Sequence, residues 1–453
     1  MKQYKLITRI FVITFIAGAC FNLLREFQSK AKDAKKEIEA RSLVLPEAAQ
    51  FSPKSGTPPH SKAYSTSAQT DNDWIGLAIV TTDITPEIRG YAGPIKMMVG
   101  TDRKGSITKI HVISHSETPS YVFDLDTFLD QFRLRGVKDS FVLGKDIDGI
   151  SRATISSEAM TRAVEKSIKL AGHQVLGLET SGLALEEKPL PIEQIVIPLI
   201  LFGIAVLGVV SRSTIIRWTA MIGGLLYFGI IKSTMVSVVQ IANICLLKFP
   251  SFHQSPLWYM LIGLTLLTTP LWGMVFCGSL CPFAAVQELL YNIVHRKERW
   301  PKRILSEGID QRSRYAKYGV LLTAVIVSVL LSNASAANIE PFLTLFTLNA
   351  TKLGWALLLL TLLAAIFHFR FWCKHLCPVG GCLGLIARMS LFKIQLGDNC
   401  VNCDACEKIC PTRAITMNEQ KLPVIDYPEC ILCGKCVQRC PKDTLTIRRA
   451  SKR

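Results

Sequence analysis

Long apolar stretches are the feature that most constrains the fold of this 453-residue chain. A helix needs about 20 apolar residues to cross the roughly 30 Å of hydrocarbon in a bilayer. Six stretches approach or exceed that length, and we expect an integral membrane α-helical protein with about six spans. They are Leu6–Leu24, Ile192–Val210, Trp218–Leu247, Leu257–Phe276, Tyr318–Ala337 and Leu353–Phe369. The composition agrees, because 19% of the residues are charged, against about 25% in soluble domains.

The distribution of charge orients these spans. Lys and Arg number 52 against 35 Asp and Glu, which leaves a net charge of +17. The excess lies in Ser211–Arg217, His295–Lys317 and Arg370–Arg453, which fall on one side if all the spans are real. Basic loops stay in the cytoplasm, so we expect both termini inside and residues 25–190 outside. The basic excess is therefore a topology signal and predicts no nucleic-acid partner, because the sequence has no basic face with interleaved aromatic residues.

The part before the second span divides into three segments. Residues 1–24 are predicted to be a transmembrane anchor, with a cleaved signal peptide as the alternative. Residues 25–73 are predicted to be a helix and a linker rich in Ser, Thr, Pro and Gly. Residues 74–180 are predicted to form a small α+β domain, with strands at Ile95–Val99 and Ile107–Ile113 and helices at Phe123–Arg135 and Ser157–Ala171.

The strongest signal for chemistry is a cysteine pattern that occurs twice near the C-terminus, within residues 395–450. Each run has the spacing Cys-x-x-Cys-x-x-Cys-x-x-x-Cys-Pro, which is that of bacterial ferredoxins, where the fourth cysteine reaches the other cluster. We therefore predict two [4Fe–4S] sites. The first set is Cys400, Cys403, Cys406 and Cys440, and the second is Cys430, Cys433, Cys436 and Cys410. Zinc and disulfides are the alternatives, and eight cysteines in two such repeats argue against both.

Two further cysteine pairs each follow a predicted span in the membrane domain, residues 192–382. They are Cys277 and Cys281, followed by Pro282, and Cys373 and Cys377, followed by Pro378. The repeated arrangement indicates an internal duplication. Each pair is expected at the cytoplasmic face, where the four thiolates would share a third metal or iron–sulfur site, with Cys382 as an extra ligand. A reduced dithiol or buried packing cysteines are the alternative. Lys232 interrupts the third span and is either a functional intramembrane charge or a span boundary.

One stretch of the external domain, Asp148–Ser157, is suited to binding phosphate. It is small and polar and precedes a predicted helix. Backbone N–H groups at a helix N-terminus, together with the helix dipole, favour an anion. The alternative is an ordinary helix start capped by Ser156 or Ser157.

The external domain resembles the flavin-binding domain of the RnfG, NqrC and NosR/NirI proteins. The resemblance rests on Gly90–Ile95, Val99–Asp102, His115–Pro119 and the motif Asp148, Ser151, Ala153 and Thr154. It implies FMN attached through a phosphodiester to Thr154, although Arg152 stands where the family has Gly. Glu117 and Thr118, with His115, would line the isoalloxazine ring or form an ordinary turn.

The membrane part resembles NapH and NosR, which carry paired Cys-x-x-x-Cys-Pro motifs. The order of domains is similar to NosR/NirI proteins over residues 75–453, in a shorter chain. The resemblance implies a multi-pass protein of the bacterial inner membrane with a periplasmic FMN domain and a cytoplasmic ferredoxin domain. It would link a cytosolic donor or quinone to a periplasmic reductase such as nitrous oxide reductase. A redox-sensing regulator or maturation factor, and a quinol or flavin oxidoreductase subunit, are the alternatives, so the sequence leaves open whether it is an enzyme. It also leaves open what carries electrons across the bilayer.

Overall fold

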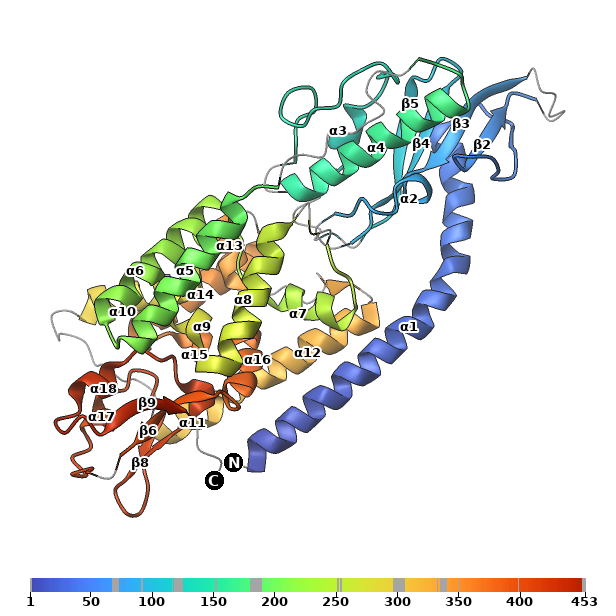
Figure 1. Cartoon of the computed structure of the whole chain (residues 1–453). Helices are drawn as coiled ribbons and strands as arrows, with labels where there is room; N and C mark the ends of the chain where they lie inside the picture. Colours follow the sequence, from blue (N-terminus) through green and yellow to red (C-terminus); the bar gives the residue numbers. More distant parts are fainter. Residues whose placement is uncertain are drawn as a thin grey trace.

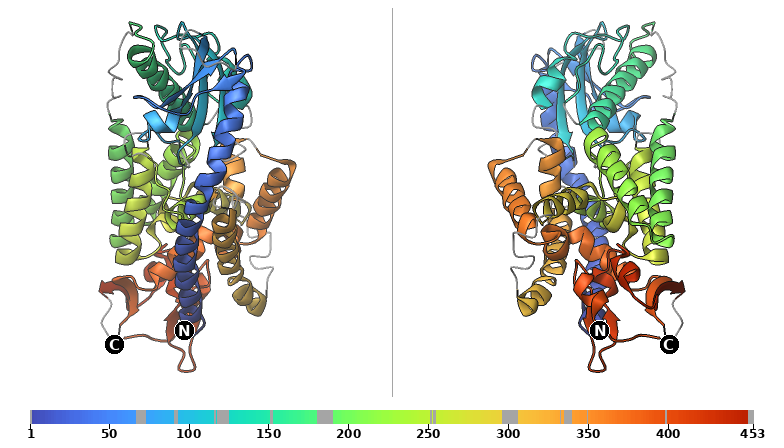
Figure 2. Two further views of the ribbon diagram at one scale, coloured as in Figure 1. Left: turned by 90° about the vertical axis from the view of Figure 1, so that its right-hand side faces the viewer. Right: turned by 90° about the vertical axis from the view of Figure 1, so that its left-hand side faces the viewer.

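The protein is long and has three parts in a row, with one helix running beside them. The computed structural model describes residues 2–66, 73–90, 93–115, 117, 125–150, 153–179, 190–250, 252, 255–295, 306–331, 333–334, 340–348, 350–397 and 399–449. The external domain lies at one end, a helical bundle in the middle and the cysteine-rich domain at the other end (Figure 1). The same order is visible in both side views (Figure 2).

The first helix, α1 (Lys2–Val44), is continuous over 43 residues, or about 65 Å. It contains both the predicted anchor and the helix predicted after it, which form one continuous helix. At its start, the Tyr4 hydroxyl donates to Asp426 Oδ2 over 2.9 Å. Near its end, the Val44 carbonyl accepts from Thr108 Oγ1 over 2.9 Å. Hydrogen bonds thus join both ends of α1 to distant parts of the chain.

The external domain is a five-stranded antiparallel sheet with helices packed against it. The order is β1 (Gln50–Phe51), β2 (His60–Tyr64), β3 (Trp74–Val80), β4 (Lys96–Asp102) and β5 (Ile107–Ser114). Asp102 Oδ1 closes the turn between β4 and β5 by accepting from the backbone of Lys104 and Ser106. The short α2 (Thr81–Ile84) and α3 (Leu125–Asp130) and the long α4 (Thr154–Gln174) complete the domain. The segment predicted as a linker contains β2, which the sequence hides because it is short and flanked by Pro and Gly.

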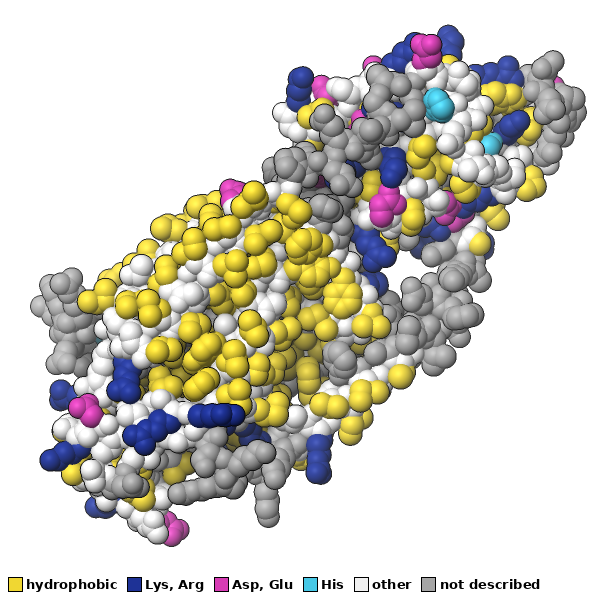
Figure 3. Space-filling view, viewed as in Figure 1, with side chains coloured by type: hydrophobic (Ala, Val, Ile, Leu, Met, Phe, Trp, Pro, Cys, Tyr) yellow, Lys and Arg dark blue, Asp and Glu magenta, His cyan; other side chains and the backbone are white. Residues whose placement is uncertain are grey.

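The membrane domain is a bundle of helices of unequal length. Its elements are α5 (Glu193–Val210), α6 (Thr214–Gly224), the π-helix η1 (Leu225–Ile231), α7 (Val238–Cys245), α8 (Pro256–Trp272), α9 (Val275–Ser279), α10 (Pro282–His295), α11 (Glu307–Ser313), α12 (Ala316–Leu331), α13 (Pro341–Thr347), α14 (Lys352–Phe367), α15 (Phe371–His375) and α16 (Pro378–Ala387). Exposed apolar side chains cover this bundle, and Lys and Arg gather at the end near the cysteine-rich domain (Figure 3).

Within the described residues, three helical segments are long and apolar enough to cross a membrane: Glu193–Val210, Thr214–Ile231 and Gly308–Leu331. The pair α13 and α14, bent by 103°, would be a fourth. Leu6–Gly18, Pro256–Trp272 and Pro378–Ala387 are shorter apolar helices. These apolar helices identify the chain as a membrane protein. The number of six spans stays a prediction.

The third predicted span, Trp218–Leu247, is not one helix. The helix ends at Ile231, and the Lys232 ammonium pairs with Glu193, at the start of α5, over 2.6 Å. Ser233 has a positive φ of 46°, and the chain continues into the separate α7. Lys232 is therefore a residue of the helix end that faces the external domain.

The C-terminal domain has the two-fold repeat that its cysteine runs suggested. Strands β6 (Phe392–Leu396) and β9 (Leu445–Arg449) pair antiparallel, as do β7 (Ile415–Met417) and β8 (Pro423–Ile425). Each repeat has one short helix, α17 (Ala405–Ile409) and α18 (Lys435–Arg439), and the 3₁₀ turn η3 (Tyr427–Glu429) lies between them. The domain docks under α8, where the rings of Trp272 and Phe392 stack at 5.8 Å.

Candidate functional site

The eight cysteines of the C-terminal runs line two separate cavities. Cys400, Cys403, Cys406 and Cys440 line one, and Cys410, Cys430, Cys433 and Cys436 line the other. These are the two sets that the spacing predicts, including the exchange of the fourth cysteine. Each set lines one cavity, and the two cavities have about 370 and 350 Å³ of empty volume.

When no cation is bound, burial favours the protonated form of the thiols in the second set. Burial raises the pKa of the Cys436 thiol to about 12, and burial also raises the pKa of Cys433. Such thiols stay protonated at neutral pH unless a bound cation favours the thiolate. Four converging cysteines are the donor set of a [4Fe–4S] cluster, so the residues present fit this group.

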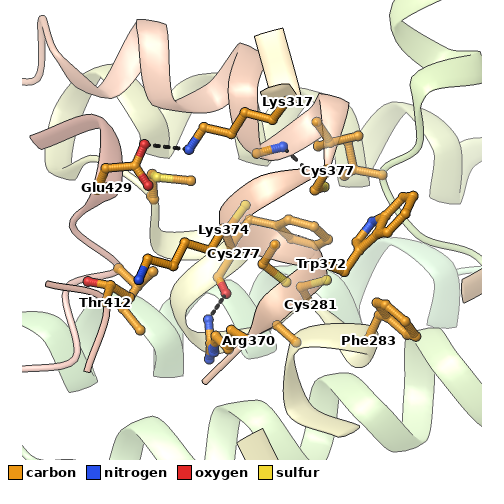
Figure 4. Close-up of a pocket in the computed structure, with 18 of the residues that line it drawn as sticks. Cys277, Cys281, Phe283, Lys317, Arg370, Trp372, Lys374, Cys377, Thr412 and Glu429 are labelled. Carbon is orange, nitrogen blue, oxygen red and sulfur yellow. Dashed lines mark hydrogen bonds and ion pairs between the residues drawn. The ribbon is translucent and has the colours of Figure 1, made fainter. Parts of the chain in front are cut away.

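The four cysteines of the membrane domain meet in a third cavity, the largest of the three. Cys277, Cys281, Cys373 and Cys377 line it, together with Lys317, Arg370, Lys374 and several aromatic side chains (Figure 4). Its empty volume is about 660 Å³. Four convergent thiols enclosed by apolar walls again fit a metal or iron–sulfur group. Cys382 does not line this cavity and packs in a different apolar cluster, near Cys245.

A duplicated unit brings these cysteines together. In each copy a long helix, α8 or α14, is followed by a break, a five-residue helix and a helix that starts with Pro. The breaks are at Gly273 (φ 99°) and Arg370 (φ 51°), where a positive φ interrupts the helical course of the chain. The second cysteine of each pair directly precedes the Pro of the last helix.

The cavity lies where the bundle meets the C-terminal domain, because Thr412, Glu429 and Ile431 line it together with the four cysteines. That this side of the bundle faces the cytoplasm stays a prediction. Arg212 marks the lower end of α6, because its carbonyl accepts from Gln438 of the C-terminal domain. Gly224 lies about 15 Å further along the helix. A Cβ added to Gly224 would overlap the Leu280 carbonyl, and one on Gly229 would lie 3.0 Å from Pro282. The Cys277–Cys281 loop therefore rises well into the bundle.

The third cavity shares a wall with the second site of the C-terminal domain. Thr412 and Ile431 line both cavities. The Lys317 ammonium, from α12, bonds the carboxylate of Glu429 over 2.5 Å, and both side chains are almost fully buried. Glu429 immediately precedes Cys430. The membrane domain and the cysteine loop of the C-terminal domain are thus joined at the site itself.

The predicted flavin motif lies where the loop after Ile147 enters α4. Thr154 is the first residue of this helix, and Ala153 is its N-cap. The alternative caps are wrong, because Ser156 and Ser157 lie inside the helix. The Ser156 hydroxyl donates to Glu117 Oε2 over 2.6 Å, and Ser157 Oγ accepts from the Ile150 backbone.

Hydrogen bonds fix the loop that leads into α4 and the first turn of this helix. Gln131 accepts from the Asp148 backbone N–H over 2.7 Å and donates to its carbonyl over 3.1 Å. Glu117, which is buried, reaches the first turn of α4 from the other side. Ser151, Thr118 and the side chain of Thr154 lie outside the described residues. A helix start with neighbouring backbone fixed in this way suits a phosphate, so the residues fit FMN.

Sequence reasoning missed two buried charge clusters beside the third cavity. Asp310, His368 and His375 lie close enough to hold a metal. The Asp310 carboxylate, however, already bonds Lys374 over 2.6 Å and Arg314 over 2.8 Å, and these cations favour an ion-pair network over a metal site. Glu288 is the centre of the other cluster, with Arg217 and Arg370. Apart from Arg314, which is four residues from Asp310, the partners are too far apart in sequence for a local pattern to reveal them.

Family models match three regions of the chain. A model of the FMN-binding domain matches residues 90–169. A model of a 4Fe-4S binding domain matches twice, at 254–301 and 353–397, which correspond to the two copies of the duplicated unit. A model of a 4Fe-4S dicluster domain matches residues 399–444.

Curated relatives cover parts of the chain. Uncharacterized protein MJ0750 of Methanocaldococcus jannaschii is 30% identical over 184 residues, which are 40% of this chain and 74% of that protein. Regulatory protein NosR of Pseudomonas aeruginosa is 32% identical over 224 residues, 47% of this chain and 31% of NosR. Protein NirI of Paracoccus denitrificans is 29% identical over 213 residues, 45% of this chain and 30% of NirI. The chain thus spans about a third of NosR and NirI. With its FMN-binding and 4Fe-4S domains, it belongs to the NosR/NirI-type flavo-iron-sulfur proteins.

Proposed function

We propose that this electron-transfer protein connects iron–sulfur clusters in its C-terminal domain to an FMN on Thr154 of its external domain, by way of a third centre inside the membrane domain. The observation that carries the proposal is the wall shared by the cavity of Cys277, Cys281, Cys373 and Cys377 and the cavity that contains Cys430. When bound, the clusters supply one-electron exchange, and FMN supplies both one- and two-electron exchange.

The chain's own residues hold these groups in place and exclude water. Phe276, Phe283 and Trp372 close the third cavity with apolar surface. The buried pair of Lys317 and Glu429 fixes the C-terminal domain against the membrane domain. Because the third cavity extends from the C-terminal domain into the bundle, a group bound there would shorten the remaining distance to the external domain.

The proposal assigns a side of the bacterial inner membrane to each domain. The basic loops place the C-terminal domain in the cytoplasm and the FMN domain in the periplasm. The donor is then a cytosolic protein or a quinone, and the acceptor a periplasmic reductase, with nitrous oxide reductase suggested by the resemblance to NosR. Attachment of FMN to Thr154 would keep the flavin from being lost outside the cell.

A second candidate function is a redox-sensing regulator or a maturation factor for such a reductase. The name of the relative, Regulatory protein NosR, favours it. The two functions differ in their dependence on the flavin. A Thr154→Ala variant that still supports maturation of the reductase but no longer supports its turnover identifies the conduit, whereas loss of maturation identifies the second function.

The flavin part of the proposal is tested by in-gel fluorescence of the purified, SDS-denatured chain from a host with the flavin-attaching enzyme. We expect a fluorescent band that is lost in Thr154→Ala. Thr161→Ala is the matched control, since Thr161 lies two turns further along the same helix and bonds only the Ser157 carbonyl among the described hydrogen bonds. A dark band in the unchanged protein would overturn covalent attachment.

A further inference from the structure

Arg370 is the largest fully buried side chain among the described residues, with 1% of its surface exposed. It lies at the break between α14 and α15, in the second copy of the duplicated unit, and its guanidinium reaches into the first copy. It donates to the Cys277 carbonyl over 2.7 Å and to the Gly278 carbonyl over 3.2 Å. Two further bonds, of 2.5 and 2.9 Å, go to Glu288 Oε2.

The Glu288 carboxylate is shared by two arginine side chains. Arg217, from α6, bonds the same carboxylate over 3.0 and 2.7 Å and also reaches the Gly278 carbonyl. All three side chains are at most 3% exposed. Two guanidiniums and one carboxylate leave one positive charge in excess. An uncompensated charge is costly inside a protein, so this excess requires a negative partner nearby.

The four-cysteine cavity is where that partner would lie. Arg370 lines the cavity (Figure 4). Two other cations line it. Lys317 pairs with Glu429, and Lys374 shares Asp310 with Arg314, so the Asp310 network also has an excess positive charge. Of the three, Arg370 is the one bonded to the backbone of a cavity cysteine.

We propose that Arg370 is the counter-charge of the four-cysteine site, held in place by Glu288 and Arg217, and that it sets the reduction potential of the group bound there. The inference rests on the proposed function, because it requires an iron–sulfur group on these cysteines. Such a group with four thiolate ligands is anionic, and one further electron adds negative charge in a low-dielectric interior. Net charge and hydrogen bonding around a cluster set its potential. A fixed cation beside it makes reduction easier.

The redox step is the transfer of one electron to the bound group. One electron is added from an external reductant, dithionite in the test, which is oxidised. No covalent bond forms or breaks and no proton is taken up, because the guanidinium remains protonated throughout. Arg370 is thus a positioning residue that acts through its charge.

Two substitutions in the same network make opposite predictions. Arg370→Gln removes the excess positive charge, so the midpoint potential of the third centre should fall. Glu288→Gln removes the negative charge, so the potential should rise. Arg370→Lys keeps the charge and should lie between Arg370→Gln and the unchanged protein. Arg388→Gln is the control, because Arg388 packs over Tyr4, away from the cavity, and should cause no shift.

The measurement is a redox titration of the purified full-length chain followed by electron paramagnetic resonance. The signal of the third centre is identified as the one lost in Cys373→Ser. Shifts of opposite sign in Arg370→Gln and Glu288→Gln support the inference. Shifts of the same sign, or none, overturn it, since a structural disturbance has no reason to follow the sign of the charge.

The iron content separates this inference from the proposed function. Iron beyond that of two clusters in the unchanged chain supports a third centre, whatever the variants do. Iron for two clusters alone overturns the third centre and the inference with it. Loss of the additional iron in Arg370→Gln but not in Arg370→Lys supports the counter-charge, because charge then decides whether the group is held.

Discussion

The backbone of Gly278 lies directly against the backbone of Ile431. A Cβ added to Gly278 would overlap the Ile431 carbonyl oxygen. Gly278 follows Cys277 of the membrane domain, and Ile431 follows Cys430 of the C-terminal domain. The absence of a side chain at one position thus allows two cysteine loops, far apart in sequence, to approach to backbone contact.

Gly278→Ala should separate these loops. The methyl group must displace backbone, and overpacking of this kind costs about 1–3 kcal/mol. We expect a lower melting temperature and slower electron exchange between the two sites, measured by differential scanning fluorimetry and by rapid-mixing absorbance. Gly263→Ala is the matched control, because a Cβ there meets nothing within 4 Å and alanine favours a helix by up to about 1 kcal/mol. Equal melting temperatures and equal rates of electron exchange in the two variants would contradict the contact between Gly278 and Ile431.

Cys373→Ser and Cys382→Ser should differ in their effect on bound iron. Both residues are half-buried, but Cys373 lines the third cavity and Cys382 packs in a different apolar cluster. Cys373→Ser should lose the iron of the third centre and keep that of the C-terminal domain, whereas Cys382→Ser should lose none. Iron per chain is measured by plasma mass spectrometry. Equal losses in both variants would contradict the assignment of Cys373, and not Cys382, as an iron ligand.

The ion pair of Lys317 and Glu429 predicts a non-additive mutant cycle. Replacing one partner leaves a buried charge without compensation, at a cost of about 3–5 kcal/mol. Lys317→Met and Glu429→Leu should therefore each destabilise the docked C-terminal domain. The double variant should recover much of the loss, since it buries no charge. Urea unfolding followed by cluster absorbance measures the four stabilities, and additive losses would contradict the pairing.

The ion pairs of Glu37 should make the contact between α1 and the external sheet depend on pH. Burial acts to raise the pKa of Glu37, but Lys96 at 2.5 Å and Lys54 at 3.5 Å lower it below its ordinary value. A carboxyl with a lowered pKa stabilises the fold above its unfolded pKa, and this contribution is lost as the pH falls through the folded pKa.

Glu37→Gln should therefore cost up to about 1 kcal/mol at neutral pH, as expected for a partly exposed pair. The difference from the unchanged protein should shrink below the ordinary pKa of Glu and vanish below the lowered pKa of Glu37 in the folded state. Thermal unfolding across a pH series measures this. Glu39→Gln, at an exposed position of the same helix, should show no such dependence. A difference that stays constant with pH would rule out the carboxylate as its source.

Local sequence patterns predicted the cysteine sets and two strands of the external sheet, because these features depend on the spacing of nearby residues. The two cysteine runs gave the sets that converge in the C-terminal domain, because ligand spacing within a tight loop fixes which sulfurs can meet. The strands around Ile95–Val99 and Ile107–Ile113 were also predicted, since alternation of apolar residues reports a half-buried strand. The pairing of the two membrane motifs followed from recognising their repetition.

Long-range packing accounts for what local patterns missed. The position of Cys281 depends on the positive φ of Gly273 and on the absence of side chains at Gly224 and Gly229. The length of α1, which continues from the predicted anchor to Val44 without a break, was also not predicted. Glu288 meets Arg217 and Arg370 only in the folded bundle, and no spacing rule joins residues so distant in sequence.

The most direct test of the connection between the domains uses sealed vesicles that hold the chain with its C-terminal domain outward. Dithionite, which does not cross lipid readily, is added outside, and the absorbance of the flavin inside is followed. The account predicts that the flavin is reduced, and that Cys281→Ser, which removes a ligand of the third centre, stops this. Reduction of the clusters while the flavin stays oxidised in the unchanged protein, or equal flavin reduction in the variant, would contradict it.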